Sequence, residues 1–471
     1  MDKLFPDIKE ELLQEDISSP YRPDEIYALF SGEMDTAILD SSLTSDAGRF
    51  SFIGLHPFAK ITGRKDRTVL STKSETRNIG EPPLEVLDHL ISSTRVINTT
   101  DSPLAAGCMG FFSYGLKNSI ELLPSNAMDD TSIPDIYFVF YRVILTFDAT
   151  RPGRIRISVL DMKDNGRLDP AELLEDTKLK IMAYRGGRIS LRGFSRGKIA
   201  SNFAKQDYIA SINKALEHIR AGDIYQVCLA QRFSSSFSGE PYDLFLRLNR
   251  DNPSPFAAYL NFDRIKVVSS SPELFLRVRG RSIETRPMKG TRPIGGTEEE
   301  TRRMIRELTE NEKEKAELSM IVDLERNDLG KVSEHGSVIL KEHRRIETYP
   351  TVIQSISIVQ GTLRTGTSTS DIIKACFPGG SISGCPKIRA LQMIDELEPH
   401  ARGVYTGAIG YLSFHDTLDL NIAIRTITIR NGYAYFHAGG GIVVDSDPEK
   451  EFEETLIKAK ALINAVRPVN D

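Results

Sequence analysis

The sequence contains no uninterrupted run of 18 apolar residues, the length that a membrane-spanning helix requires. Its opening segment, MDKLFPDIKEELLQED, is acidic and lacks the apolar stretch of a secretory signal peptide. The four cysteines form no CxxC pair, which in a chain of 471 residues argues against a disulfide framework and against a zinc site. We therefore expect a cytoplasmic protein with no membrane segment.

An excess of one charge is absent as well. The chain has 60 basic and 65 acidic residues, a formal net charge of -5, and no block of five like charges. Because nucleic acids and anionic membranes require a concentrated basic surface, neither is an expected partner. Small molecules are the expected ligands.

The glycine motifs that bind nucleotide phosphates are also missing. Residues 377–391, FPGGSISGCPKIRAL, and 437–446, HAGGGIVVDS, are rich in glycine, yet neither matches GxxxxGK[ST] or GxGxxG in the required context. The first segment leads into a helix expected to start at Pro386-Lys387, and the free N–H groups of such a helix end suit an anion. A carboxylate ligand is favoured over a nucleotide.

Strand patterns dominate what the sequence does contain. Residues 137–147 and 154–161 alternate or run apolar with β-branched and aromatic side chains, and three short strands follow as FAAYLNF, IKVVSSS and LFLRV. Asn431-Gly432 joins two alternating segments in a type I′ turn. Since strands and helices do not alternate as βαβ units, we predict an α+β fold, with large antiparallel sheets in a sandwich-like core flanked by helices such as 386–397 and 448–466.

An exposed stretch rich in Arg and Gly interrupts this pattern near the middle of the chain. We predict an N-terminal region over residues 1–165, a connecting segment over 166–200 and a second region over 201–467.

Three features of the second region carry candidate chemistry. Lys289 stands in a loop-like segment of Gly, Pro and Thr, SIETRPMKGTRPIGGT, where a lysine is either solvated or a functional amine. Arg425 lies within an apolar alternating segment and needs an anionic partner, either a structural carboxylate or a bound acid. Just after the lysine segment, Thr297 and Glu300 fit a capping box that opens a helix.

Two helix-patterned segments each carry a pair of glutamates three residues apart, Glu314 with Glu317 and Glu451 with Glu454. If the two pairs meet across a cleft, their oxygens suit a hard cation such as Mg²⁺. The alternative for glutamates at this spacing is a solvated helix face.

Together, the motifs of the chain resemble one family, the chorismate-utilising enzymes, which include anthranilate synthase component I, aminodeoxychorismate synthase component I, isochorismate synthase and salicylate synthase. The resemblance lies in AGDIYQVCLAQRF, NPSPFAAYL, SSSPELFL, RPMKGTRP, AELSMIVDLERNDLG, FPGGSISGCPKIRALQMIDELEP, RGVYTGAIGY, AIRTITI and AGGGIVVDSDPEKEFEET. In the first half, AILDSSLTSDAGRFSFIG is similar to the segment that binds tryptophan in these families.

Two positions separate the reactions within that family. The enzymes that add water have a lysine base where this chain has Gln226, and an amide cannot take a proton from water. Anthranilate synthases typically have alanine at the position of Lys289, whereas the PMKGT form resembles aminodeoxychorismate synthase component I, in which this lysine bonds to the ring.

The resemblance therefore implies an enzyme of p-aminobenzoate and folate biosynthesis that converts chorismate and ammonia to 4-amino-4-deoxychorismate. A separate glutamine amidotransferase subunit would supply the ammonia, because this chain has no GxCxG nucleophile elbow of its own. The alternatives are anthranilate synthase component I and a non-catalytic regulatory subunit that binds chorismate or tryptophan.

The resemblance also implies catalytic roles. Lys289 would be the nucleophile, and burial together with Arg286 and Arg292 would keep its amine neutral. Glu273 would be the general acid, which requires an apolar setting that raises its pKa. Mg²⁺ would be held by Glu314, Glu317, Glu451 and Glu454.

Two further sets of residues follow from the resemblance. Chorismate would be bound by Gln226, Thr291, Ser381, Tyr405, Arg425, Gly439, Gly440 and Gly441. A candidate tryptophan pocket would be formed by Ser41, Arg49, Phe50, Pro255 and Phe256. The chain departs from the family at Gln354 and Leu318, where histidine is common, and a glutamine can form hydrogen bonds but cannot transfer a proton.

Overall fold

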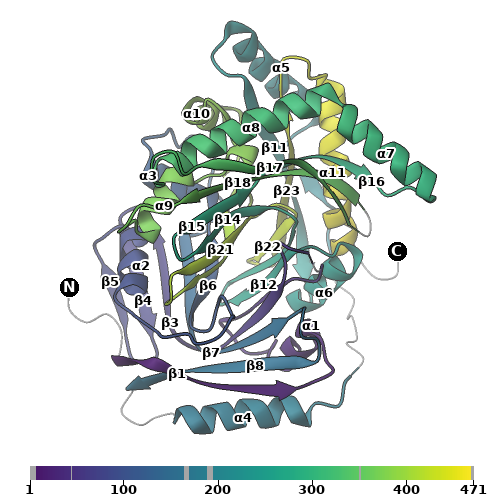
Figure 1. The fold of residues 1–471 in the computed structure, drawn as a ribbon. Helices are drawn as coiled ribbons and strands as arrows, with labels where there is room; N and C mark the ends of the chain where they lie inside the picture. The colour runs from purple at the N-terminus through teal and green to yellow at the C-terminus, as the bar shows by residue number, and fades with distance from the viewer. Residues whose placement is uncertain (1–6, 44, 164–168, 188–194, 350–351, 468–471) are drawn as a thin grey trace.

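The fold is built on antiparallel strand pairing. The computed structural model describes residues 7–43, 45–163, 169–187, 195–349 and 352–467. In that part of the chain every ladder between named strands is antiparallel, and the ladders join the strands of both halves of the sequence (Figure 1). Helices cover the outside of this strand network, which confirms the predicted α+β class.

In chain order the strands are β1 (Asp7–Ser18), β2 (Thr36–Asp40), β3 (Phe50–Arg64), β4 (Arg67–Thr72), β5 (Thr76–Ile79), β6 (Gly107–Phe112), β7 (Ile136–Asp148), β8 (Arg154–Lys163), β9 (Ser195–Arg196), β10 (Ala200–Ser201), β11 (Gln226–Ser238), β12 (Phe256–Phe262), β13 (Ile265–Ser271), β14 (Leu274–Arg279), β15 (Ser282–Arg286), β16 (Met288–Pro293), β17 (Ile339–Thr348), β18 (Val352–Thr362), β19 (Gly384–Cys385), β20 (Ala408–Ser413), β21 (Thr417–Ile422), β22 (Thr426–Arg430) and β23 (Tyr433–Ile442).

The α-helices are α1 (Pro23–Tyr27), α2 (Pro83–Ser92), α3 (Lys117–Ile120), α4 (Pro170–Ala183), α5 (Lys205–Ala221), α6 (Pro241–Asp251), α7 (Glu298–Glu310), α8 (Glu312–Gly330), α9 (Thr369–Cys376), α10 (Lys387–Leu397) and α11 (Pro448–Val466), with two 3₁₀ turns, η1 (Tyr114–Leu116) and η2 (Gly380–Ile382). The capping box predicted at Thr297 opens α7. The helices predicted over 386–397 and 448–466 are confirmed as α10 and α11. Within the described residues, no helix is both long and apolar enough to cross a membrane.

The central strand β7 explains why the segment 137–147 is so apolar. It pairs with β3, β6 and β8, and its residues from Ile136 to Phe147 are all buried. A strand covered on both faces has no solvent side, so its sequence runs apolar rather than alternating.

The prediction of the late hairpin is confirmed at its turn and wrong in the length of its first strand. Asn431 and Gly432 both have positive φ, 51° and 76°, which confirms the type I′ turn between β22 and β23. The alternating segment before it is not one strand, because β21 ends at Ile422 and β22 begins at Thr426. Arg425, expected inside a strand, lies in this break with φ 49°. The break occurs where the chain changes partners, since β21 pairs with β14 and β20 while β22 pairs with β13 and β23.

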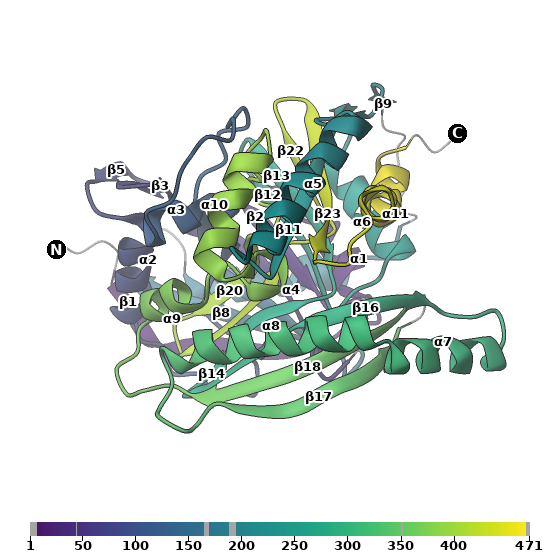
Figure 2. The same ribbon diagram turned by 90° about the horizontal axis from the view of Figure 1, so that it is seen from above.

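The helices cover two different groups of strands. α8 packs on β16 and β18, whereas α5, α10 and α11 pack on β11 and β23 (Figure 2). The glutamates of α8 and α11 therefore project toward the strands that carry Lys289 and the glycines of residues 439–441.

The two predicted regions share one hydrophobic core. β2 pairs with β12 and β6 pairs with β20, so strands before residue 165 are hydrogen-bonded to strands after residue 200. Phe112 also contacts Phe377, with ring centroids 6.5 Å apart. The connecting segment does not separate two cores, and the division of the chain at residues 166–200 stays a sequence-based prediction.

Strand β20 is expected to tolerate no added side chain at Gly410, where it lies between β6 and β21. Gly410 faces Gly110 in this ladder, and a Cβ at Gly410 would lie 1.9 Å from the backbone oxygen of Asp419. We expect Gly410→Ala to lower the free energy of unfolding by about 3 kcal/mol, because the clash is with backbone that cannot move aside.

Urea denaturation measures this effect. Gly330→Ala is the matched control, since a Cβ there meets nothing within 4 Å. Equal denaturation midpoints for the two variants would contradict the close approach of these strands.

Candidate functional site

Lys289 lies in strand β16 rather than in the loop that its Gly- and Pro-rich surroundings predicted. It is opposite Ser355 of β18, and the register slips at Gly290, which has φ 71°. A Cβ at Gly441 would lie 3.1 Å from the Lys289 Nζ and 3.2 Å from the side-chain amide of Gln226. The absence of a side chain at Gly441 is what lets these two groups approach β23.

The amine of Lys289 is held as an ammonium ion. Its Nζ lies 3.3 Å from Glu317 Oε2. Burial acts to lower the pKa of Lys289, but Cys228, Glu317 and Glu273 together outweigh burial and raise that pKa above its usual value. The prediction of a neutral amine is therefore wrong for this state of the protein.

The reason is that the two arginines expected to repel the ammonium are committed elsewhere. Arg286 Nε donates to Glu284 Oε1 at 2.7 Å, and Arg292 Nη1 donates to Glu314 Oε1 at 2.9 Å. Their charges are already compensated by these carboxylates, and the charged group that pairs with Lys289 is the carboxylate of Glu317.

Glu273 has the properties that a general acid needs. Its side chain is buried, and burial raises its pKa to about 7. Hydrogen bonds from Ser381 and from the backbone N–H of Met288, and the charge of Lys289, act in the opposite direction but are weaker. The expected raised pKa is confirmed, and it lets Glu273 carry a proton near neutral pH.

The four glutamates lie against two strands. A Cβ at Gly440 would lie 3.2 Å from Glu451 Oε2 and 3.7 Å from Glu454 Oε1, so α11 brings these carboxylates against the glycine backbone of β23. On α8, Glu317 pairs with Lys289 of β16, and a Cβ at Gly290 of β16 would lie 2.8 Å from Glu314 Oε2. Lys313 lies 3.9 Å from both Glu317 and Glu451, so the two helices come close at these residues.

The donor set fits a divalent cation in type. Carboxylate oxygens are what Mg²⁺ prefers, and Glu314 Oε2 is buried with no hydrogen-bond partner among the described residues. In the described part of the chain, however, no three His, Cys, Asp or Glu side chains already converge on one point. The glutamates would have to close on the ion, and each is paired with a cationic side chain instead.

Two more buried oxygens at this site lack partners among the described residues, Gln226 Oε1 and Gln354 Oε1. Gln354 lies opposite Thr291, and its Nε2 is 3.4 Å from Thr291 Oγ1. Because buried polar atoms are rarely left unpaired, these oxygens point to a polar ligand. Leu318, the other departure from the family, is a core residue of α8 that is only 1% exposed.

Tyr405 and Arg425 lie near the same strands. The ring of Tyr405 stacks on that of His437, with centroids 4.8 Å apart and planes 5° apart. Arg425 is deeply placed, and burial lowers its pKa. Within the described residues no carboxylate forms an ion pair with Arg425, which favours the bound acid over the structural carboxylate as its partner.

Arg402 and Glu398 were not predicted as site residues, but they link the segments that carry such residues. They form a fully buried ion pair at 2.6 Å. Arg402 also donates to the backbone oxygens of Cys228 and Ile382, and Glu398 accepts from the N–H of Ala230. In the sequence, the sign of this ion pair is a Glu and an Arg four residues apart.

Ser381 and the glycine loop are held by α8. Glu325 Oε1 accepts from the N–H of Gly380 at 2.8 Å, which fixes η2 beside Glu273. Gly439, Gly440 and Gly441 lie in β23, and Thr291 lies in β16. The structure thus brings Lys289, Glu273, Gln226, Glu317, Ser381 and Gly441 close together, while their predicted roles stay predictions.

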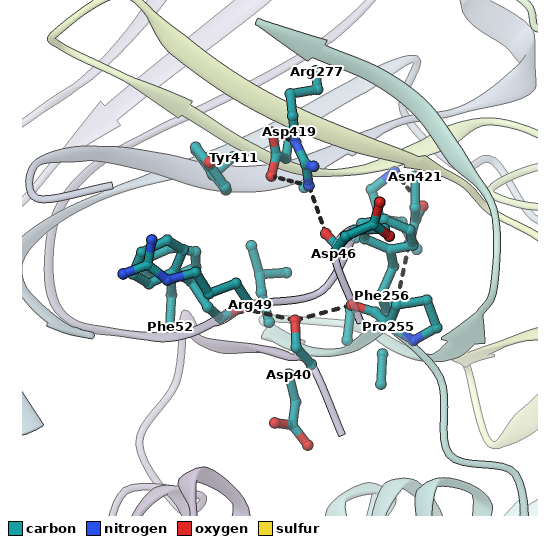
Figure 3. A pocket seen from close by; sticks show the side chains of 18 of the residues that line it. Asp40, Asp46, Arg49, Phe52, Pro255, Phe256, Arg277, Tyr411, Asp419 and Asn421 are labelled. Carbon is teal, nitrogen blue, oxygen red and sulfur yellow. Dashed lines mark hydrogen bonds and ion pairs between the residues drawn. The ribbon is translucent and has the colours of Figure 1, made fainter. Parts of the chain in front are cut away.

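A second cavity collects the predicted tryptophan residues. Ser41, Arg49, Phe50, Pro255 and Phe256 all line one cavity of about 190 Å³. Figure 3 shows Asp46 near Phe256, and Arg277 near Asp419, with which it pairs at 3.1 Å. The cavity combines aromatic walls with charges of both signs, which suits an amino acid.

The fold and this arrangement define the class of protein. Residues 39–464 match the family described as chorismate binding enzyme, and the chain belongs to that family, whose members use chorismate.

The relatives of this chain are named for two different activities. The chain is 36% identical to anthranilate synthase component 1 of Acetivibrio thermocellus, over 90% of this chain and 88% of that protein. It is 37% identical to aminodeoxychorismate synthase component 1 of Bacillus subtilis, over 89% of each. Overall identity therefore does not separate these two activities.

Solved structures agree on the fold. Anthranilate synthase component I from Streptococcus pneumoniae superposes with a TM-score of 0.78 at 31% identity, over 90% of this chain and 94% of that one. MenF, the menaquinone-specific isochorismate synthase from Escherichia coli, has a TM-score of 0.72 at 16% identity, over 98% and 97% of the two chains, and shows a shared fold only.

The raised pKa of Glu273 predicts a pH-dependent stability. Its carboxyl has a pKa of about 7 when folded and about 4.3 in an unfolded chain, so the folded state favours the protonated form. This stabilisation is fully present below about pH 4 and is lost as the pH rises through 7. We expect Glu273→Gln, which cannot ionise, to gain about 3 kcal/mol relative to the parent protein between about pH 4 and pH 8.

Urea unfolding at a series of pH values measures the difference. Glu299→Gln, on the exposed face of α7, is the control and should follow the parent at every pH. A constant difference between Glu273→Gln and the parent would show that Glu273 ionises normally.

Proposed function

We propose that this chain is aminodeoxychorismate synthase component I, which converts chorismate and ammonia to 4-amino-4-deoxychorismate and water. The observation that carries the proposal is a partly buried primary amine, Lys289, near a buried carboxyl with a pKa of about 7, Glu273. An enzyme that delivers ammonia directly to the ring has no need of this amine. The expected cytoplasmic role in p-aminobenzoate and folate biosynthesis stays a prediction.

In the proposed reaction the amine of Lys289 bonds to the ring of chorismate while the ring hydroxyl leaves as water, taking a proton from Glu273. Ammonia then bonds to the carbon that lost the hydroxyl, and the lysine leaves. The ion pair between Lys289 and Glu317 has to be broken, and the ammonium has to lose a proton, before the first step. Gln226 supplies no base for adding water to the ring, which disfavours the hydration reaction.

Substrate binding would use the charges around the site. Arg425, which has no carboxylate partner among the described residues, and Tyr405 would bind the enolpyruvyl carboxylate. Thr291 and Ser381 would contribute hydroxyl groups, and Gly439 and Gly441 would contribute backbone donors. Glu314, Glu317, Glu451 and Glu454 would hold Mg²⁺, which when bound offsets the negative charge of the ring carboxylate.

The proposed partner is a glutamine amidotransferase that supplies ammonia. The relatives named component 1 support a two-component enzyme. Free ammonium would replace the partner in an assay of the isolated chain.

Replacing Lys289 tests the proposal. We expect Lys289→Met to lose at least about 10³-fold of its activity with either nitrogen donor, because a covalent path needs the amine. Incubation of the parent protein with chorismate and no ammonia should increase the intact mass by chorismate minus one water, and Lys289→Met should show no increase. Lys341→Met, an exposed lysine on β17, is the control.

The products separate the alternatives. Release of pyruvate and a fluorescent aromatic amine from chorismate, Mg²⁺ and ammonium would assign anthranilate synthase component I instead. A chain that binds chorismate without adduct or turnover would assign the regulatory role.

We also propose that the cavity of Figure 3 binds tryptophan. Phe50 and Phe52 would contact the indole, while the ion pairs around Arg277 and Asp419 would face the charged groups of the amino acid. The chain itself contains no tryptophan, so the fluorescence of an added tryptophan reports its binding without background.

Titration of tryptophan with the protein is expected to give saturable binding with a blue-shifted emission. Phe50→Ala should weaken the binding about tenfold through loss of apolar contact, whereas Tyr433→Ala, at the distant hairpin, should leave it unchanged. Emission that stays at the free-tryptophan value throughout the titration would argue against this ligand.

A further inference from the structure

Every one of the four glutamates near β23 is paired with a cation from the chain itself. The pairs are Arg292 with Glu314 at 2.9 Å, Lys289 with Glu317 at 3.3 Å, Lys458 with Glu454 at 2.5 Å, and Lys313 with both Glu317 and Glu451 at 3.9 Å. The charge that a divalent ion would supply is thus already provided by side chains.

Lys313 differs from the other cations because it spans two helices. Its Nζ is equidistant from Glu317 Oε1 on α8, the helix that carries Lys313, and from Glu451 Oε1 on α11. Lys458 forms its ion pair with Glu454 of the same helix, at the i,i+4 spacing, and donates to the backbone oxygen of Gly439. Lys313 is therefore the cation that compensates two like charges across the gap between the helices.

The side chain of Lys313 can move away from Glu317 and Glu451 into solvent. It is 47% exposed, whereas Glu317 and Glu451 are 15% and 9% exposed. A lysine has a flexible four-carbon stem and a strongly hydrated charge, so its ammonium moves into water at low cost. The less mobile carboxylates stay behind as ligands.

We propose that Lys313 is a built-in counter-ion that occupies the metal position between α8 and α11, and that a divalent cation binds by displacing it. The inference rests on the metal site of the proposed function. Lys313 is a positioning residue here: it sets how tightly the ion binds and holds the two helices together without one.

Displacement of Lys313 by a metal ion would also affect Lys289, the proposed nucleophile. Glu317 forms ion pairs with Lys313 through Oε1 and with Lys289 through Oε2. An ion bound by Glu317 competes with both ammonium groups for one carboxylate. Loading of the metal and release of Lys289 from its ion pair are therefore linked through Glu317.

Lys313→Met tests the inference, because methionine keeps the length of the stem and removes the charge. Mn²⁺ serves as the probe, with free Mn²⁺ measured by electron paramagnetic resonance. Loss of two partly exposed ion pairs should tighten Mn²⁺ binding about two- to tenfold. Without metal, the melting temperature of the variant should fall, since Glu451 loses its ion-pair partner and Glu317 keeps only Lys289, and saturating Mn²⁺ should restore it.

Two control variants separate this role from a structural one. Lys315→Met removes a lysine two residues further along α8 that pairs with Glu312, away from the site, and should bind Mn²⁺ like the parent. Lys313→Arg keeps the charge and should also bind Mn²⁺ like the parent.

The outcomes distinguish the inference from the metal site on which it rests. If the parent binds Mn²⁺, and Glu317→Gln abolishes the binding, unchanged or weaker binding by Lys313→Met overturns the role of Lys313 alone. If the parent binds no Mn²⁺, the metal site and the inference both fail. Tighter binding combined with a lower metal-free melting temperature supports the inference.

Discussion

The buried ion pair between Arg402 and Glu398 is the interaction on which the site depends. It connects α10 to the backbone of β11 and to η2, and Arg402 also lies 5.8 Å from the ring centroid of Tyr405. Removing one partner of such a pair leaves an uncompensated charge in the interior, which typically costs about 3–5 kcal/mol. The positions of the strand, the glycine loop and the tyrosine are therefore fixed together, and a ligand meets surfaces that are already in place.

Two acids in different environments, Glu273 and Glu317, lie close to the amine of Lys289. Glu273 is buried, which raises its pKa to about 7, while Glu317 forms ion pairs with two ammonium groups. This separation of roles lets one site both donate a proton and hold positive charge. The same pairing explains why the state of Lys289 depends on what else occupies Glu317.

The sequence predicts well those features that depend on local pattern. The apolar run of β7, the type I′ turn at Asn431-Gly432 and the limits of α10 and α11 follow from periodicity and capping alone. Positions that depend on distant partners do not. The interruption at Arg425 arises because β21 and β22 pair with different strands, and the charge of Lys289 depends on Glu317, 28 positions away in the chain. Site membership came from family resemblance, whereas distances and charge states required the structure.

Asp46 connects the cavity of Figure 3 to β15 and β17 through two ion pairs. It lines that cavity and pairs with Arg286 of β15 at 3.0 Å and with Arg345 of β17 at 3.0 Å. Arg286 stands three positions before Lys289, and Arg345 lies on the strand that flanks β18. A ligand that displaced Asp46 would remove one counter-charge from each arginine and leave Arg286 paired with Glu284 and Arg345 paired with Glu342 and Glu347. Occupancy of this cavity would thereby change the electrostatic surroundings of the segment that leads into β16.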